Sequence, residues 1–134
     1  MIKFVLWDFY NVLYFPRTDQ LNTELIEFIE DHNKKYGFGV LTAVNSDITE
    51  WLQERKVKRY FEFIKNTAEL GLPKTDPGLY EMVVNSLGFK PSQVLMIDDL
   101  SENLSAAKEA GLKTLQYRKT VPFNKQLSEA SIEL

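Results

Sequence analysis

The chain alternates short apolar runs with longer amphipathic segments, and a polar residue follows nearly every run. The apolar runs cover residues 2–7, 38–41, 61–64 and 94–97, and residues 113–117 complete a fifth predicted strand. Short apolar runs separated by helical segments are typical of parallel strands that helices cover on both faces. We therefore predict an α/β fold: a Rossmann-like three-layer α/β/α domain around a parallel five-stranded sheet, with right-handed crossovers.

Four segments have the periodicity of amphipathic helices. They are residues 19–36, a segment beginning at Ile48 after a cap at Ser46 or Asp47, a segment with Pro77 in its first turn and Gly88 beyond its end, and residues 102–110, which Gly111 terminates. The last residues, 120–134, fit either a short docking helix or a mobile tail. At 134 residues, we expect residues 1–134 to form a single domain.

Charge and composition indicate which binding partners are disfavoured and which cellular compartment suits the chain. The formal net charge is −3 and the sequence pI is about 5.2, which disfavours binding to nucleic acid or to an anionic membrane. Asp8 interrupts the first apolar run, so this run is too short to cross a membrane. Because the chain has no cysteine, it suits a reducing compartment, and we expect a cytoplasmic protein.

Five polar residues fall at predicted strand ends or in the loops beyond them. They are Asp8, Thr42, Lys74, Asp98 and Asp99. If the carboxylates meet at the carboxyl edge of the sheet, each pair about 4 Å apart costs on the order of 4 kcal/mol. Lys74 and a divalent cation would offset this repulsion, and Mg²⁺ is the ion that suits a few carboxylates and a phosphate. Thr42 and Lys74 have the alternative roles of a turn hydroxyl and a surface lysine.

At these positions the sequence resembles the haloacid dehalogenase (HAD) superfamily. Its four motifs look like Asp8-Phe9-Tyr10-Asn11 after the first run, Gly39-Val40-Leu41-Thr42, Pro73-Lys74-Thr75-Asp76-Pro77, and Ile97-Asp98-Asp99 followed by Asn103. Each motif is weak alone, but all four occur in the family's order. The resemblance implies a HAD-like fold and a phosphatase whose cofactor is Mg²⁺.

The resemblance also implies a role for each residue. Asp8 would attack phosphorus and form an aspartyl phosphate, Thr42 would donate a hydrogen bond to the phosphoryl group, and Lys74 would neutralise charge. Mg²⁺ would be held by Asp8, Asp98, Asp99 and the backbone carbonyl of Tyr10. Asn103 would contact these ligands without touching the metal itself.

Tyr10 departs from the pattern, because the family's phosphatases have a second aspartate there that acts as general acid and base. A phenol is a poor base at neutral pH, and acid–base catalysis contributes a factor of roughly 10² to 10⁴. We therefore expect a slow phosphohydrolase, or one selective for esters with good leaving groups. Two alternatives stay open: a catalytically impaired binding or regulatory module, and a hydrolase of the haloacid dehalogenase type, in which tyrosine occupies this position.

The motif spacing leaves no room for a cap domain. Asp8 and Thr42 are 34 positions apart, Thr42 and Lys74 are 32 apart, and predicted helices fill both intervals. A capless site excludes water poorly around a small molecule. The phosphorylated substrate is therefore expected to be macromolecular, or a homo-oligomer is expected to cover the cleft.

Overall fold

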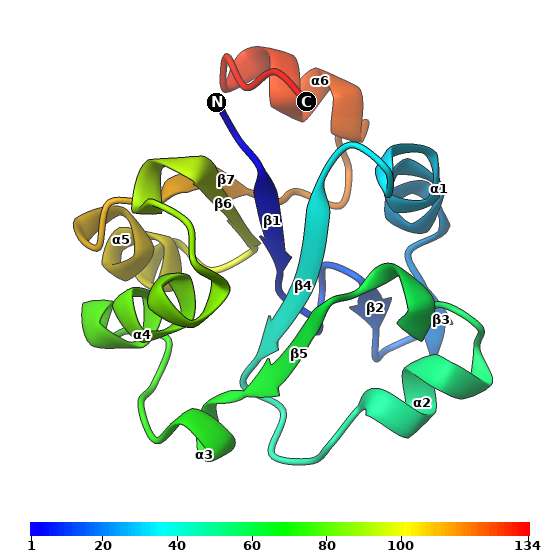
Figure 1. Cartoon of the computed structure of the whole chain (residues 1–134). Helices are drawn as coiled ribbons and strands as arrows, with labels where there is room; N and C mark the ends of the chain where they lie inside the picture. Colours follow the sequence, from blue (N-terminus) through cyan, green and yellow to red (C-terminus); the bar gives the residue numbers. More distant parts are fainter.

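The computed structural model describes all 134 residues and has a parallel five-stranded sheet at its centre (Figure 1). The strands are β1 (Phe4–Trp7), β4 (Gly37–Thr42), β5 (Phe63–Asn66), β6 (Val94–Asp98) and β7 (Lys113–Gln116). Their order is β5-β4-β1-β6-β7, and every neighbouring pair is parallel. The predicted strands and fold class are confirmed, and β1 lies in the middle of the sheet.

Helices cover both faces of the sheet, as Figure 1 shows. One face packs against α1 (Thr23–His32), α2 (Thr49–Glu54) and α6 (Phe123–Glu129), and the other packs against α4 (Pro77–Leu87) and α5 (Ser101–Glu109). The short helix α3 (Thr67–Leu70) and the 3₁₀ turns η1 (Lys58–Tyr60) and η2 (Pro91–Gln93) lie in connections. Side chains of β1 alternate between the two cores, with Val5 and Trp7 on the α1 face and Phe4 and Leu6 on the α4 face.

The helix expected over residues 19–36 is shorter than predicted. Residues before Thr23 instead form an antiparallel hairpin of β2 (Tyr14–Phe15) and β3 (Gln20–Leu21). Asn22 starts α1, because its side-chain oxygen accepts a hydrogen bond from Leu25 N at 3.3 Å. Asp19 has a φ of 52°, which no helix accommodates, so Leu21 matches the helical spacing but lies in a strand.

The other helix ends follow from their capping residues. Pro77 occupies the first turn of α4, and Gly88 ends this helix in the left-handed conformation at φ 79°, as expected. Asp47 accepts a hydrogen bond from Thr49 N at 2.9 Å at the start of α2. Residues 123–129 form α6, and Phe123 and Leu127 are buried in the α1-side core.

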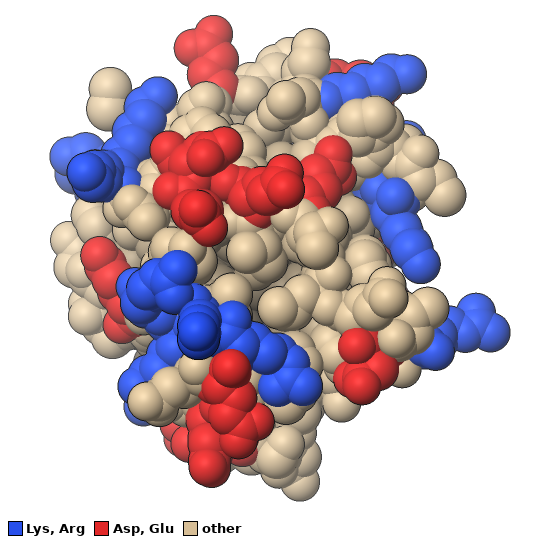
Figure 2. All heavy atoms as spheres, turned by 90° about the vertical axis from the view of Figure 1, so that its right-hand side faces the viewer, with Lys and Arg blue, Asp and Glu red and all other residues tan.

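The surface carries charges of both signs. Figure 2, which views the molecule from the side of α1 and α2, shows a row of acidic side chains above a cluster of basic ones. None of the helices combines the length and the apolar character needed to cross a bilayer.

Candidate active site

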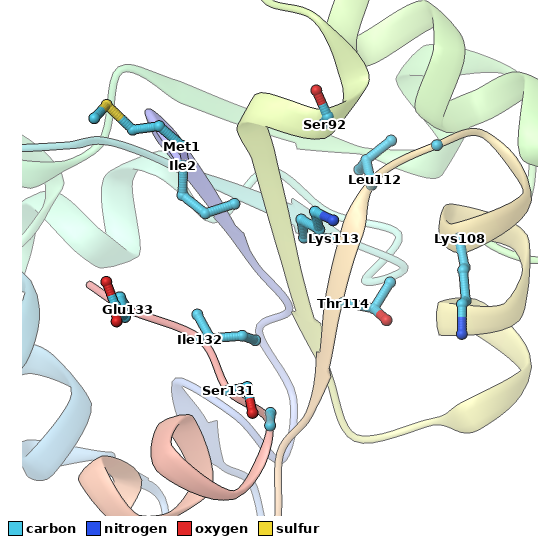
Figure 3. A pocket seen from close by; sticks show the side chains of 12 residues that line it. Met1, Ile2, Ser92, Lys108, Leu112, Lys113, Thr114, Ser131, Ile132 and Glu133 are labelled. Atoms are coloured by element: carbon cyan, nitrogen blue, oxygen red, sulfur yellow. The ribbon is translucent and has the colours of Figure 1, made fainter.

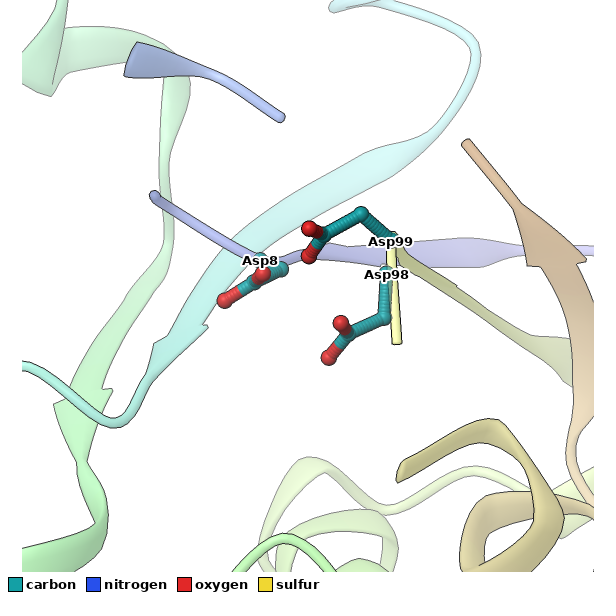
Figure 4. A group of neighbouring side chains, drawn as sticks. All are labelled: Asp8, Asp98 and Asp99. Atoms are coloured by element: carbon teal, nitrogen blue, oxygen red, sulfur yellow. The ribbon is translucent and has the colours of Figure 1, made fainter. Parts of the chain in front are cut away.

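Three carboxylates converge at the carboxyl edge of the sheet (Figure 4). Asp8 follows β1, Asp98 is the last residue of the adjacent strand β6, and Asp99 comes next. One carboxylate oxygen from each residue lies within 4.8 Å of the others. The juxtaposition follows from the parallel register, in which Trp7 pairs with Ile97 and Asp8 N donates to Ile97 O at 2.9 Å.

Lys74 bridges two of these acids from the connection between α3 and α4. Its Nζ lies 2.5 Å from Asp8 Oδ1 and 3.1 Å from Asp98 Oδ2, and the side chain is 4% exposed. Lys74 is therefore not a solvated surface lysine. The Tyr80 hydroxyl on α4 donates to the backbone carbonyl of Lys74 at 2.7 Å and fixes this connection against the site.

Asp98 uses both of its oxygens within the protein. Oδ1 accepts from Leu100 N at 3.0 Å, and Oδ2 accepts from Asn103 Nδ2 at 3.2 Å as well as from Lys74. The carboxylate is fully buried. Asn103 thus contacts Asp98, which accepts three hydrogen bonds from protein donors, and Asp99 is the more exposed member of the pair.

Burial makes this site costly for negative charge. It raises the pKa of Asp8 to about 7, and the lowering effect of Lys74 on this pKa is smaller than the effect of burial. Burial also raises the pKa of Asp99, to which the charge of Asp98 adds. Three carboxylates face one ammonium group, so the cluster lacks positive charge.

The residues present fit a hard divalent cation. Lys74 binds Oδ1 of Asp8, which leaves the other oxygen of this carboxylate without an ammonium partner, and a carboxylate oxygen of Asp99 lies within 4.8 Å of one on Asp8. The backbone carbonyl of Tyr10 accepts no backbone hydrogen bond in the turn. Such a set of a few carboxylate and carbonyl oxygens suits Mg²⁺, which completes its octahedron with water or phosphate.

Thr42 is the last residue of β4 and is buried. It therefore lies at the carboxyl edge of the sheet, as the three carboxylates do. Its Oγ1 accepts a hydrogen bond from Val44 N at 3.0 Å, so the turn role anticipated for this hydroxyl is present. Because that bond uses a lone pair, the hydroxyl hydrogen stays available for a phosphoryl oxygen. The two roles are therefore compatible.

Tyr10 belongs to an aromatic group that begins one residue after Asp8. Its side chain is 44% exposed, and its ring lies 5.6 Å from Phe9 and 5.8 Å from Tyr14. Trp51 completes this group by contacting both Phe9 and Tyr14 edge-on. Asn11 follows at φ 64°, a left-handed conformation that asparagine tolerates.

Two contributors to the site were not predicted from the sequence. They are the Tyr80 hydroxyl and the Leu100 amide, and a backbone amide has no side-chain signature. A tyrosine on the buried face of α4, so close to Lys74, was the available signal for the first. His32 lies away from the site on α1, where its Nδ1 lies 2.7 Å from Phe28 O and its ring stacks on Phe28.

Two large pockets lie at the opposite, amino end of the sheet. The pocket in Figure 3 has a volume of about 630 Å³ and lies beside the amino end of β7, where Met1, Ile2 and Ile132 line it. It contains no cluster of carboxylates comparable with that at the carboxyl end. Chemistry is therefore concentrated at the edge where β1 and β6 end.

Comparison with known proteins agrees with this geometry. A model of the haloacid dehalogenase-like hydrolases matches residues 7–117. The chain is 28% identical over 105 residues to bifunctional epoxide hydrolase 2 of Rattus norvegicus, covering 73% of the chain and 19% of that protein. It is 27% identical over 124 residues to pyrophosphatase PpaX of Bacillus velezensis, covering 89% of the chain and 57% of that protein. The chain thus spans a fifth to just over half the length of these relatives.

Solved structures share the fold. A HAD family enzyme of Bacteroides thetaiotaomicron, an aspartate-to-alanine variant in complex with magnesium and inorganic phosphate, has a TM-score of 0.80 and 16% identity, with 93% of this chain and 98% of that chain covered. A 2-haloacid dehalogenase of Pseudomonas syringae has a TM-score of 0.76 and 14% identity, with 96% and 99% covered.

Proposed function

Because the chain belongs to the haloacid dehalogenase-like hydrolase family, we propose that it is a magnesium-dependent phosphohydrolase that acts through an aspartyl phosphate on Asp8. One observation carries the proposal: Lys74 bridges Asp8 and Asp98, with Asp99 in the same cluster. Its relatives include named phosphatases, among them the D-ribitol-5-phosphate phosphatase of Bacteroides thetaiotaomicron, at 20% identity over 117 residues. Bound Mg²⁺ would supply charge stabilisation for the phosphoryl oxygens.

The contacts divide the roles between the oxygens. Lys74 holds Oδ1 of Asp8, so the other oxygen is the one free to attack phosphorus. The bond from phosphorus to the leaving-group oxygen breaks as the new bond forms, and Thr42 donates to the transferring group. Water then attacks phosphorus, which releases inorganic phosphate and restores the Asp8 carboxylate. Asp98 positions Lys74 rather than touching the phosphate.

Tyr10 sets the expected substrate preference. Because a phenol is a weaker acid than a carboxylic acid, Tyr10 assists the leaving group less than the aspartate that the family's phosphatases have at this position. Aryl and acyl phosphates are therefore the favoured substrates, because their leaving groups depart without a proton. The lack of a base for the second step also predicts that the aspartyl phosphate accumulates.

The test is phosphate release from p-nitrophenyl phosphate in the presence of MgCl₂. We expect a stoichiometric burst of nitrophenolate followed by slow turnover, abolished by EDTA and by Asp8→Asn. Equal release by wild type and Asp8→Asn would contradict the proposal.

The altered Tyr10 position also favours a second candidate, a binding module that keeps the metal site without turnover. It predicts stabilisation by Mg²⁺ and phosphate with no burst. The dehalogenase alternative predicts release of halide from a 2-haloacid that EDTA leaves unaffected.

A further inference from the structure

A pocket of about 350 Å³ adjoins the carboxylate cluster and shares Asp99 with it. Its lining residues come from three separate parts of the chain: Asn11, Phe15, Arg17, Asp99, Tyr117 and Lys119. The pocket thus lies between the β2–β3 hairpin and the segment that follows β7. A molecule held with its phosphoryl group at Asp8 has this pocket as a neighbouring space.

The walls of the pocket are held by hydrogen bonds. Gln116 Nε2 donates to the backbone carbonyl of Asp99 at 3.1 Å, and Tyr117 N donates to Asp98 O at 2.9 Å, so the end of β7 is tied to the carboxylate strand. On the other side, the Tyr14 hydroxyl donates to Asp19 Oδ1 at 2.6 Å and shapes the hairpin turn that carries Arg17. Lys119 Nζ lies 4.5 Å from the centroid of the Phe15 ring and links the two walls.

Two cations of this pocket lack an acidic partner. Neither Arg17 nor Lys119 forms a salt bridge, whereas the adjacent Arg118 pairs with Glu129 at 2.7 Å. Arginine presents a planar set of donors that matches a carboxylate or a phosphate, and lysine adds a point charge. The two positive charges lie beside a cluster that is otherwise acidic.

The position of these cations beside the carboxylate cluster indicates what they bind. The three carboxylates and Lys74 carry a net charge of −2 when ionised, which a bound Mg²⁺ neutralises. The reacting phosphoryl group lies at Asp8 within that set, whereas Arg17 and Lys119 line the neighbouring pocket. Their charges therefore face the part of the substrate that extends beyond the reacting phosphoryl group.

We propose that the pocket formed by Arg17 and Lys119 binds a second anionic group of the substrate, a carboxylate or a second phosphoryl group. This inference rests on the proposed function, since it places the reacting phosphoryl group at Asp8. It narrows the substrate class to compounds that carry a phosphoryl group and another anion.

The test uses competitive inhibition of p-nitrophenyl phosphate hydrolysis, so slow turnover of the probes does not matter. 3-Phosphoglycerate is compared with glycerol 3-phosphate for the carboxylate, and fructose 1,6-bisphosphate with fructose 6-phosphate for the second phosphoryl group. We expect at least one of the two probes with a second anionic group to bind roughly 10-fold more tightly than its partner. Arg17→Gln and Lys119→Gln should each remove most of this preference, while Arg118→Gln retains both the preference and the basal activity.

The two pairs of probes identify whether the pocket binds a carboxylate or a second phosphoryl group. Equal affinity within both pairs, or a preference that survives in both pocket variants, overturns the inference. If p-nitrophenyl phosphate is not hydrolysed, the proposed function fails by itself. The same four probes are then compared by titration calorimetry with the Mg²⁺-loaded protein, and the same contrast between Arg17→Gln, Lys119→Gln and Arg118→Gln decides whether the pocket binds a second anion.

Discussion

Asp8→Asn should stabilise the metal-free protein, and by an amount that depends on pH. Burial raises the pKa of Asp8 from 3.8 to about 7, so the folded protein retains a proton there that the unfolded chain releases. About three pKa units correspond to a cost of about 4 kcal/mol for the ionised carboxylate in the folded state. The amide removes this charge while keeping the shape of the side chain.

The sign follows from proton linkage. Because the pKa in the folded state is the higher one, proton binding stabilises the fold at low pH, and this stabilisation is lost as the pH rises from about 4 through about 7. Between pH 5 and pH 8, wild type should therefore lose on the order of 2 to 3 kcal/mol relative to Asp8→Asn. Asp99 has a raised pKa in the same direction and contributes to the pH dependence of both proteins.

Urea denaturation in EDTA at pH 5, 6, 7 and 8 measures this difference. Asp31→Asn, a change to an exposed acid on α1, serves as the control and should follow wild type at every pH. Saturating Mg²⁺ should stabilise wild type at pH 8 and stabilise Asp8→Asn much less. A difference between wild type and Asp8→Asn that is constant across this pH range would refute the assignment of the cost to the buried Asp8 charge.

Four further outcomes are expected. Lys74→Met leaves buried carboxylates without their ammonium partner and should lower the free energy of unfolding at pH 8 by roughly 3 to 5 kcal/mol in urea denaturation, with partial recovery in Mg²⁺. Tyr10→Asp should raise steady-state turnover of p-nitrophenyl phosphate by a factor of roughly 10² if the missing acid–base group limits the rate; an unchanged rate in a folded variant would contradict this reason. Phe123→Ala should cost roughly 3 to 5 kcal/mol because α6 is docked through this ring, whereas a freely mobile segment would show almost no change. Gly88→Ala should cost about 1 kcal/mol through its positive φ alone, since a Cβ there meets no atom within 4 Å.

Local patterns were enough to predict the sheet and most helix ends. Apolar runs defined the strands, and Pro77 and Gly88 bounded α4 because both act through their own backbone preferences. The β2–β3 hairpin was missed since its strands have two residues each, too short for any periodicity, and because Leu21 happens to continue the spacing of α1. Arg17 and Lys119 were also missed, as 102 residues separate them and only the folded chain brings them to one pocket.

The different roles of Asp98 and Asp99 follow from strand geometry, although the sequence presents them as an equivalent pair. Side chains of β6 alternate, so Val94, Met96 and then Asp98 face the α4 side, as Phe4, Leu6 and then Asp8 do in β1. Lys74 immediately precedes α4 and therefore meets Asp8 and Asp98 on one face.

Asp99 projects away from that face, which leaves its carboxylate free of Lys74 and places it on the wall of the Arg17 and Lys119 pocket. Asp8 thus lies between Lys74 on the α4 side and the more exposed Asp99 on the other side. The same alternation that buries the core therefore separates Asp98, which contacts Lys74, from Asp99, which we propose faces the metal and the substrate. A change of one residue in the register of β6 would exchange these two environments.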